Sequence, residues 1–131
     1  MTSRRKRVLL AEDDREMREV VRQVLETLGL EVEEASSGVA LVSCLVDDGA
    51  FDLVVTDVRM PWLSGMQVIT KARAAGFEVP VLIMTAFADD ELRGSVRKIG
   101  GALLLEKPFD MRELIAHARQ ILGIDSASGL S

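Results

Sequence analysis

The sequence predicts an α/β fold, with a parallel sheet of five strands and helices on both of its faces. Two observations predict this class. Short apolar runs alternate five times with segments whose apolar residues recur at helical spacing. The run at residues 79–84 (VPVLIM) is apolar throughout, which is typical of a strand covered on both faces. With 131 residues, 48% of them hydrophobic, the chain suits one domain with a real core.

The expected strands are short and, with one exception, mainly apolar. The exception is the second, LEVEEA, which alternates between apolar and acidic residues, as a strand does when one of its faces is wet. We expect this strand near an edge of the sheet. In chain order, the expected strands are residues 8–11, 30–35, 51–56, 79–84 and 102–105.

The expected helices follow the strands and carry apolar residues at positions i, i+3, i+4 and i+7. The first has an apolar face from Met17 to Leu28 and is followed by Gly29, and the last has the most regular stripe and is followed by Gly123. The fourth has a shorter stripe and contains Gly94, which weakens a helix. In chain order, the expected helices are residues 17–28, 38–47, 66–75, 89–98 and 111–122.

These elements place the domain at residues 7–123, between a basic tail at residues 1–6 and a polar tail or shortened linker at residues 124–131. The basic cluster at residues 4–7 is expected to be solvated, with a phosphate-binding arm as the alternative. The net charge of −5 argues against nucleic-acid binding by this segment.

Cysteine use and hydropathy indicate a cytoplasmic protein. The single cysteine, Cys44, excludes an internal disulfide, favours a reducing compartment, and is expected to be a small buried hydrophobe. No apolar run approaches the roughly 18 residues of a membrane span. The basic start is not followed by the apolar core of a signal peptide.

Polar residues gather where the expected strands end. In the stretch DLVVTDVRMP, Asp57 follows a buried strand, and it could either close that strand or serve chemistry. Because ligands bind at the carboxyl ends of parallel strands, we expect the strand-end residues to surround one site. The others are Glu12, Asp13 and Asp14 after the first strand, Thr85 after the fourth, and Glu106, Lys107 and Pro108 after the fifth.

These residue types suit phosphoryl transfer. Carboxylates that converge on one edge repel one another, which raises their pKa values unless a cation is present. Mg²⁺ suits a few carboxylates and a carbonyl, completed by waters or phosphate oxygens. A nucleophilic carboxylate, Mg²⁺, a lysine and a hydroxyl donor can together position a phosphoryl group and neutralise its charge.

Each residue also has a simpler interpretation. The acidic run could be a charge cluster at a helix N-terminus. Asp57 and Thr85 could close turns, and Lys107 could be an ordinary surface lysine. Their joint placement at four strand ends favours a site. The absence of G-x-x-x-x-G-K-[ST], and of G-x-G-x-x-G after the first strand, excludes P-loop and dinucleotide chemistry.

Four segments resemble the receiver domain of two-component response regulators, over roughly residues 7–123. In order, they are VLLAEDDREMR, DLVVTDVRMPWLSG, VLIMTA and GALLLEKPF. The resemblance implies a flavodoxin-like (βα)5 fold with strand order 2-1-3-4-5. The stretches DVRMP and MTAFAD look most like regulators of the nitrogen-regulation type, which hints at a transcriptional or hybrid-kinase context.

The resemblance implies that Asp57 accepts a phosphoryl group from the phosphohistidine of a histidine kinase. Thr85 would donate a hydrogen bond to one phosphoryl oxygen, and Lys107 would pair with another. The Lys107–Pro108 peptide would be cis, a form that is rare among X-Pro bonds in general.

The resemblance also implies a Mg²⁺ site. Asp13 would bind the ion directly and Glu12 mostly through water, with Asp57 and the carbonyl of Arg59 as further ligands. The side chain of Arg59 could also contact the group that attacks the phosphoryl group, and so tune reaction rates.

One position departs from the family pattern. Three residues before Lys107 the family usually has Tyr, Phe or His, whose ring turns inward when the threonine moves toward the phosphoryl group. This chain has Leu104, which can fill the space but presents no ring or hydroxyl. We expect the chemistry at Asp57 to be retained, whereas the usual form of output signalling is in question. Phe87 is a candidate to supply the aromatic ring that Leu104 lacks.

Two further side chains, an aromatic ring and an imidazole, could serve function. Trp62, the only tryptophan, is interpreted either as an exposed loop aromatic or as a partner contact. His117 is expected on the polar surface of the last helix, without a phosphorelay or metal role.

The favoured function is a phosphorylation-controlled signalling module that catalyses its own phosphotransfer and dephosphorylation, without a turnover substrate. A haloacid-dehalogenase-like phosphatase needs a second acid two residues after its aspartate, where this chain has Arg59. A binding module that is never phosphorylated is the third interpretation, which Leu104 keeps open.

The expected partners follow from the favoured function. They are a sensor histidine kinase or phosphotransfer protein, and an effector domain or target protein. The signal would leave through the surface of the fourth helix, fifth strand and fifth helix, where the family also pairs, so that a homodimer is left open. Membrane and direct nucleic-acid binding are not expected.

Overall fold

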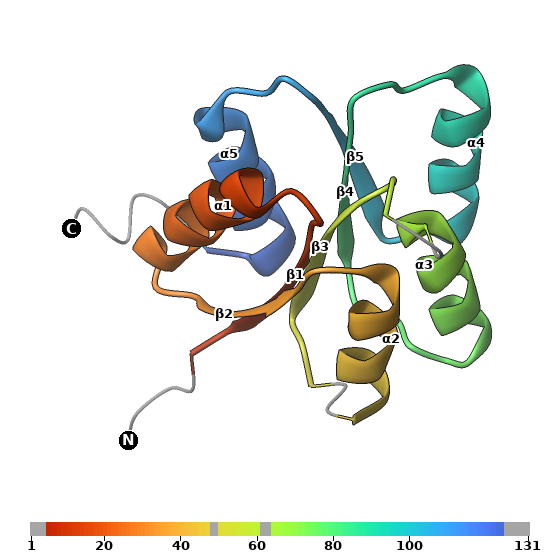
Figure 1. The fold of residues 1–131 in the computed structure, drawn as a ribbon, viewed down its shortest axis with the longest axis horizontal. Coiled ribbons are helices and arrows are strands. Elements are labelled where there is room, and N and C mark those ends of the chain that lie inside the picture. The colour runs from red at the N-terminus through yellow and green to blue at the C-terminus, as the bar shows by residue number, and fades with distance from the viewer. Residues whose placement is uncertain (1–4, 48–49, 61–63, 125–131) are drawn as a thin grey trace.

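The computed structural model describes residues 5–47, 50–60 and 64–124. Its five strands form one parallel sheet in the order β2-β1-β3-β4-β5, which confirms the predicted fold class and strand order (Figure 1). The strands are β1 (Arg7–Ala11), β2 (Glu31–Ala35), β3 (Leu53–Asp57), β4 (Val81–Thr85) and β5 (Ala102–Glu106).

Helices cover both faces of the sheet, as the alternating pattern predicts. In Figure 1, α1 and α5 lie together on one face, and α2, α3 and α4 lie on the other. The helices are α1 (Arg15–Thr27), α2 (Gly38–Asp47), α3 (Gly65–Ala74), α4 (Asp90–Ile99) and α5 (Met111–Leu122).

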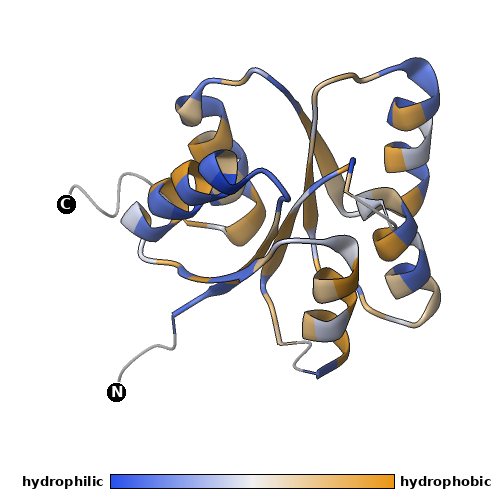
Figure 2. Ribbon diagram, viewed as in Figure 1, coloured by the Kyte–Doolittle hydropathy of each residue, from blue (hydrophilic) through white to orange (hydrophobic). Residues whose placement is uncertain are grey.

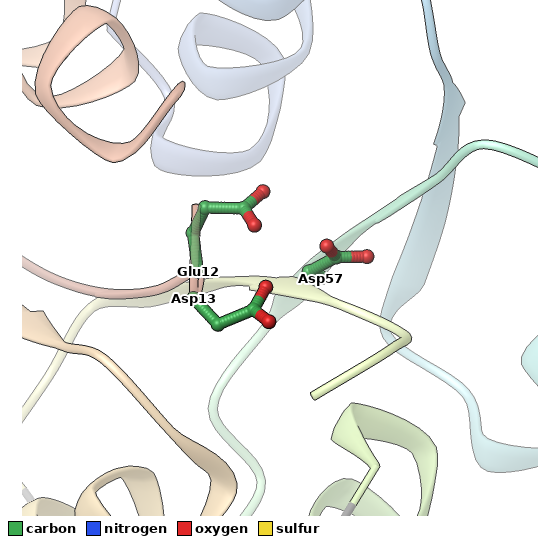
Figure 3. A group of neighbouring side chains, drawn as sticks. All are labelled: Glu12, Asp13 and Asp57. Atoms are coloured by element: carbon green, nitrogen blue, oxygen red, sulfur yellow. The ribbon is translucent and has the colours of Figure 1, made fainter. Parts of the chain in front are cut away.

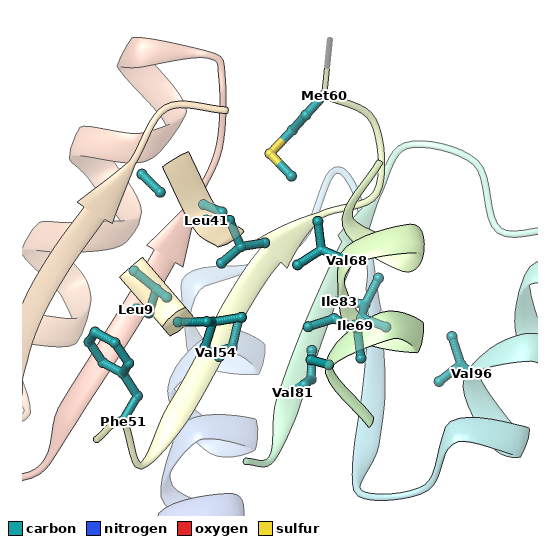
Figure 4. Packing of buried hydrophobic residues seen from close by; sticks show 14 residues of the cluster. Leu9, Leu41, Phe51, Val54, Met60, Val68, Ile69, Val81, Ile83 and Val96 are labelled. Atoms are coloured by element: carbon teal, nitrogen blue, oxygen red, sulfur yellow. The ribbon is translucent and has the colours of Figure 1, made fainter. Parts of the chain in front are cut away.

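The sheet separates two apolar cores. Successive residues of a strand point to opposite faces, so Leu9 and Val54 pack on the α2, α3 and α4 side (Figure 4), whereas Leu10 and Val55 pack on the α1 and α5 side. Figure 2 shows the consequence along the chain: the central strands are apolar, while the helices mix apolar and polar residues. The central strands are therefore buried between the two cores, and they position the loops at the carboxyl edge of the sheet.

Side-chain caps decide where the helices begin. The Asp14 carboxylate accepts from the backbone N–H groups of Glu16 and Met17, so α1 begins at Arg15, two residues before the first residue of its predicted apolar face. Ser64 and Gln67 form a capping box at the start of α3. The apolar stripe locates a buried face, whereas the cap locates the first turn.

The strands that carry Asp57 and Thr85 end one residue later than their apolar patterns predict. Asp57 is paired with Met84, and Thr85 is paired with Glu106, so both belong to the backbone ladder. A strand predicted from apolar residues alone ends before these two polar residues. Backbone pairing does not require an apolar side chain, so the neighbouring strand extends each ladder by one residue. The two side chains are consequently held by regular strand backbone.

Several surface expectations change. Arg7 is the first residue of β1 and forms ion pairs with Glu31 and Glu33, so this member of the basic cluster is not a solvated tail residue. Cys44 is partly rather than fully buried, against the α2, α3 and α4 core. His117 is half-buried rather than on the open surface because its helix, α5, packs beside α1.

Other expectations fall outside the described part. Trp62 and residues 125–131 lie there, so the roles proposed for them and the limits of the two tails stay predictions. Among the helices that are described, none has the length and apolar character needed to span a bilayer.

Candidate functional site

Three carboxylates meet at the carboxyl ends of two adjacent inner strands, β1 and β3. Glu12 and Asp13 follow β1, and Asp57 closes β3, so strand pairing brings the three side chains together (Figure 3). One oxygen from each lies within 4.8 Å of the others. Glu12 is fully buried and Asp57 is nearly so, whereas Asp13 is exposed and faces solvent.

Lys107 joins the two buried carboxylates. Its Nζ donates to Oε1 of Glu12 at 2.8 Å and to Oδ2 of Asp57 at 3.1 Å. The following Lys107–Pro108 peptide is cis, as the resemblance implied, and the Lys107 N–H donates to the carbonyl of Thr85. The lysine, which follows β5, therefore links the carboxylates that lie at the ends of β1 and β3.

Arg59 forms a hydrogen bond with Asp57, whereas the Thr85 hydroxyl is hydrogen-bonded to another residue. The backbone N–H of Arg59 donates to Oδ1 of Asp57 at 3.2 Å, which orients the carboxylate. The Thr85 hydroxyl is held in a local turn: it accepts from the Phe87 N–H and donates to the Phe87 carbonyl, both at 3.1 Å. The structure thus brings Arg59 onto Asp57 and places Thr85 at a neighbouring strand end, with its hydroxyl bonded elsewhere.

An open hollow of about 400 Å³ adjoins the carboxylates. Its lining residues are Asp13, Val58, Arg59, Met60 and Ser64. The exposed carboxylate and the residue expected to supply a carbonyl ligand therefore line the same solvent-accessible space. This is the side from which an ion and a reacting group can approach.

Burial controls the charge state of Glu12. Desolvation raises the pKa of Glu12 to about 7, against the hydrogen bonds from Lys107 and Asp14, which lower it. Burial lowers the pKa of Lys107, but its hydrogen bonds to Glu12 and Asp57 outweigh this, so the net shift is upward. Glu12 is the more deeply buried partner, so desolvation wins there while Lys107 stays cationic.

The raised pKa of Glu12 predicts a pH-dependent stability. The folded chain holds this proton up to about pH 7, whereas an unperturbed glutamate releases it near 4.5, so the group's contribution to stability falls as pH rises between those values. In the absence of Mg²⁺, the titration of Glu12 should lower the free energy of unfolding by about 2 kcal/mol as the pH rises from about 5 to about 8.

Glu12→Gln removes the titration and keeps an acceptor for Lys107. We expect the variant to exceed the wild type in stability at about pH 8, and the difference to shrink toward about pH 5. Urea unfolding at several pH values measures it. Parallel profiles for the two proteins would show that Glu12 does not titrate in this range.

The structure adds two residues that sequence reasoning missed. Arg18 donates from Nη1 to the backbone carbonyl of Glu12 at 2.8 Å. Gly65 starts α3 so close to Asp57 that an added Cβ would lie 2.3 Å from the Asp57 carbonyl oxygen. Helical spacing places Arg18 one turn after Asp14, so the sequence could have suggested that its side chain lies near the acidic run. Its hydrogen bond to the Glu12 carbonyl depends on the loop geometry and could not be predicted.

The position without an aromatic ring borders a second hollow. Leu104 is partly buried, and with Arg93, Val96, Arg97 and Glu106 it lines a space of about 280 Å³ between α4 and β5. Leu104 therefore borders open space at the surface between α4 and β5. Phe87 is 63% exposed, so its ring does not compensate in this structure.

The donor set fits Mg²⁺. All three clustered groups are carboxylates, and hard oxygen ligands of this kind are those that Mg²⁺ prefers. The exposure of Asp13 leaves access for the waters that the ion usually keeps.

Two curated relatives match most of the chain. The transcriptional regulatory protein FixJ of Azorhizobium caulinodans is 37% identical over 124 residues, which is 93% of this chain and 57% of FixJ. The response regulator MprA of Mycobacterium sp. strain KMS is 37% identical over 116 residues, 88% of this chain and 50% of MprA. The chain thus spans about half the length of these relatives.

Solved structures have the same fold. The receiver domain of the Francisella response regulator 1452 superposes with a TM-score of 0.82 at 27% identity, over 90% of this chain and 97% of that one. The Vibrio cholerae chemotaxis protein CheY4 gives 0.82 at 26% identity, over 91% and 100%. The family model described as the response regulator receiver domain matches residues 8–119. The chain therefore belongs to the response regulator receiver domain family of two-component signalling.

Proposed function

We propose that this receiver domain accepts a phosphoryl group on Asp57 from the phosphohistidine of a histidine kinase or phosphotransfer protein. The observation that carries the proposal is the contact of Lys107 with both Asp57 and Glu12, beside the exposed carboxylate of Asp13. A nucleophile, a cation and a metal-binding acid then converge on one open edge of the sheet. Phosphoryl transfer depends on this positioning and charge neutralisation.

In the forward step, an Asp57 carboxylate oxygen attacks phosphorus. The new O–P bond forms as the P–N bond to the donor imidazole breaks, and the electron pair stays on the imidazole nitrogen. The hydrogen bond from the Arg59 N–H to Oδ1 holds the carboxylate in one orientation for this attack. Lys107 stands beside Oδ2, where its charge can pair with an oxygen of the incoming group.

Dephosphorylation returns the site to its starting state. Water attacks the phosphorus, the O–P bond to Asp57 breaks, and the products are the carboxylate, inorganic phosphate and a proton. The module therefore catalyses its own two reactions and has no separate substrate to turn over. The Arg59 side chain borders the open hollow and can modulate the approach of the donor or of water.

The proposed site would hold Mg²⁺ through Asp13, Asp57 and the Arg59 carbonyl, and through Glu12 mostly by way of water. When bound, the ion neutralises charge on the phosphoryl oxygens. The all-oxygen donor set supports this assignment. The Thr85 hydroxyl would leave its turn with Phe87 to donate to the phosphoryl group.

Signalling then requires that phosphorylation change the surface of α4, β5 and α5. The hollow beside Leu104 lies on this surface, so repacking there is sterically open without an aromatic ring. We place the module in the cytoplasm, with a sensor kinase upstream and an effector domain or target protein downstream, and leave a homodimer as an alternative assembly. Direct binding to nucleic acid or membrane by this segment is not proposed.

Intact-mass analysis tests the phosphoacceptor. Wild-type chain incubated with a small acyl phosphate and Mg²⁺ should gain one phosphoryl mass, and Asp57→Asn should gain none. Asp52→Asn is the control because Asp52 precedes the same strand at its opposite end. Equal labelling of wild type and Asp57→Asn would refute the assignment by placing the phosphoryl group on another residue. Labelling of neither would also refute it and would favour a module that works unphosphorylated.

A further inference from the structure

Arg18 connects the edge of the sheet to the candidate metal site. Its guanidinium donates from Nη1 to the Glu12 carbonyl at 2.8 Å and from Nε to Oε1 of Glu34 at 3.0 Å. The side chain is only 17% exposed, so it is held between the two acceptors rather than freely solvated. Glu34 is a β2 residue that lies opposite Leu10 of β1.

The carbonyl that Arg18 holds belongs to the peptide between Glu12 and Asp13, the first two of the three acidic residues that follow β1. The Glu12 N–H donates to the carbonyl of Ala35 at 3.1 Å, which ends the ladder between β1 and β2. Beyond that point, Asp13 lies outside regular secondary structure and is exposed. Arg18 therefore acts where the strand no longer fixes the backbone, and the direction of the Asp13 side chain depends on this peptide.

We propose that Arg18 is a positioning residue for metal binding, because its hydrogen bond to the Glu12 carbonyl fixes the Glu12–Asp13 peptide and so aims the Asp13 carboxylate. The inference rests on the proposed Mg²⁺ site. Partners that orient metal ligands typically change affinity by about 10- to 100-fold when removed. Glu34 in turn orients Arg18 through the second arm of the guanidinium.

Charge and orientation predict opposite results for the loss of Arg18. A cation near a metal site repels Mg²⁺, so removal of its charge alone would strengthen binding. Loss of the fixed peptide would weaken it. Pairing with Glu34 at 3.0 Å already neutralises much of the Arg18 charge, so we expect orientation to dominate.

Arg22 provides a matched control on the next turn of α1. Its Nε lies 3.2 Å from Oε2 of the same Glu34, and its Nη1 donates to Glu26. It has comparable charge and partial burial, and no hydrogen bond joins it to the Glu12 carbonyl within the described structure. Loss of Arg22 should therefore affect the ion pairs of α1 and not the metal-binding peptide.

Calorimetric titration with Mg²⁺ tests the proposal, with urea unfolding of each variant in the absence of the ion. Arg18→Met should bind Mg²⁺ about ten-fold more weakly than the wild type. Arg18→Lys, which keeps the charge but cannot make both contacts in the same geometry, should also be weaker. Arg22→Met should retain wild-type affinity. Arg18→Lys decides the question if Arg18→Met does not fold.

The outcomes separate this inference from the proposed function. A wild-type chain that does not bind Mg²⁺ removes the metal site and the inference with it. Normal wild-type binding, with unchanged or tighter binding in both Arg18 variants, overturns only the role of Arg18. A lower unfolding free energy with unchanged Mg²⁺ affinity would show that Arg18 serves stability alone.

Discussion

Lys107→Met should slow phosphorylation of Asp57 by a small acyl phosphate by about 10²- to 10³-fold at saturating Mg²⁺. Among the described residues, Lys107 is the cation that pairs with both Glu12, at 2.8 Å, and Asp57, at 3.1 Å, so its loss removes the charge proposed to pair with a phosphoryl oxygen. The rate of mass gain, followed by intact-protein mass spectrometry, measures the effect.

The same variant should bind Mg²⁺ more tightly than the wild type, because a competing cation has left the carboxylates. This split between affinity and rate distinguishes a reacting role from a structural one. Lys98→Met, an exposed change on α4 with the same loss of charge, should alter neither quantity. An unchanged rate in Lys107→Met would mean that the lysine serves only to neutralise the resting site.

Gly65→Ala should destabilise the fold by about 4 kcal/mol. The new Cβ would lie 2.3 Å from the Asp57 carbonyl oxygen and 2.9 Å from the Thr56 hydroxyl oxygen. The first contact is with strand backbone, which cannot move aside, so α3 must shift and strain the hydrogen bond from the Gly65 N–H to the Val58 carbonyl. Urea unfolding at neutral pH measures the loss.

Gly94→Ala is the matched control for Gly65→Ala. Gly94 lies inside α4, and nothing lies within 4 Å of the position that its Cβ would take. Alanine is the better helix former, so this change should stabilise the chain by about 0.5 to 1 kcal/mol. A similar response of the two variants would show that α3 can move away from Asp57 at little cost.

The sequence predicted the site because five strands in parallel force their carboxyl ends to one edge. Asp57, Glu12, Asp13 and Lys107 could be grouped from the order of apolar runs alone. Their detailed contacts could not, because the bond from Lys107 to Glu12 spans 95 residues and depends on β1 and β5 being held by the strands between them.

Local features were harder to predict where side-chain chemistry competes with apolar patterning. Asp14 starts α1 at Arg15 by accepting hydrogen bonds from two backbone N–H groups, and the spacing of apolar residues carries no information about this cap. The closeness of Gly65 to Asp57 and the bond from Arg18 to a carbonyl depend on the positions of loops. Thr85 was predicted at the correct edge, but its turn with Phe87 is set by backbone geometry.

The bridge made by Lys107 also has a consequence for biosynthesis. The acids at 12, 13 and 57 are made well before the lysine, which is 50 residues beyond Asp57. A partly synthesised chain that has paired β1 with β3 brings like charges together without their cation. The repulsion opposes early closure of this edge until β5 arrives, so closure of the candidate site is coupled to the pairing of the last strand.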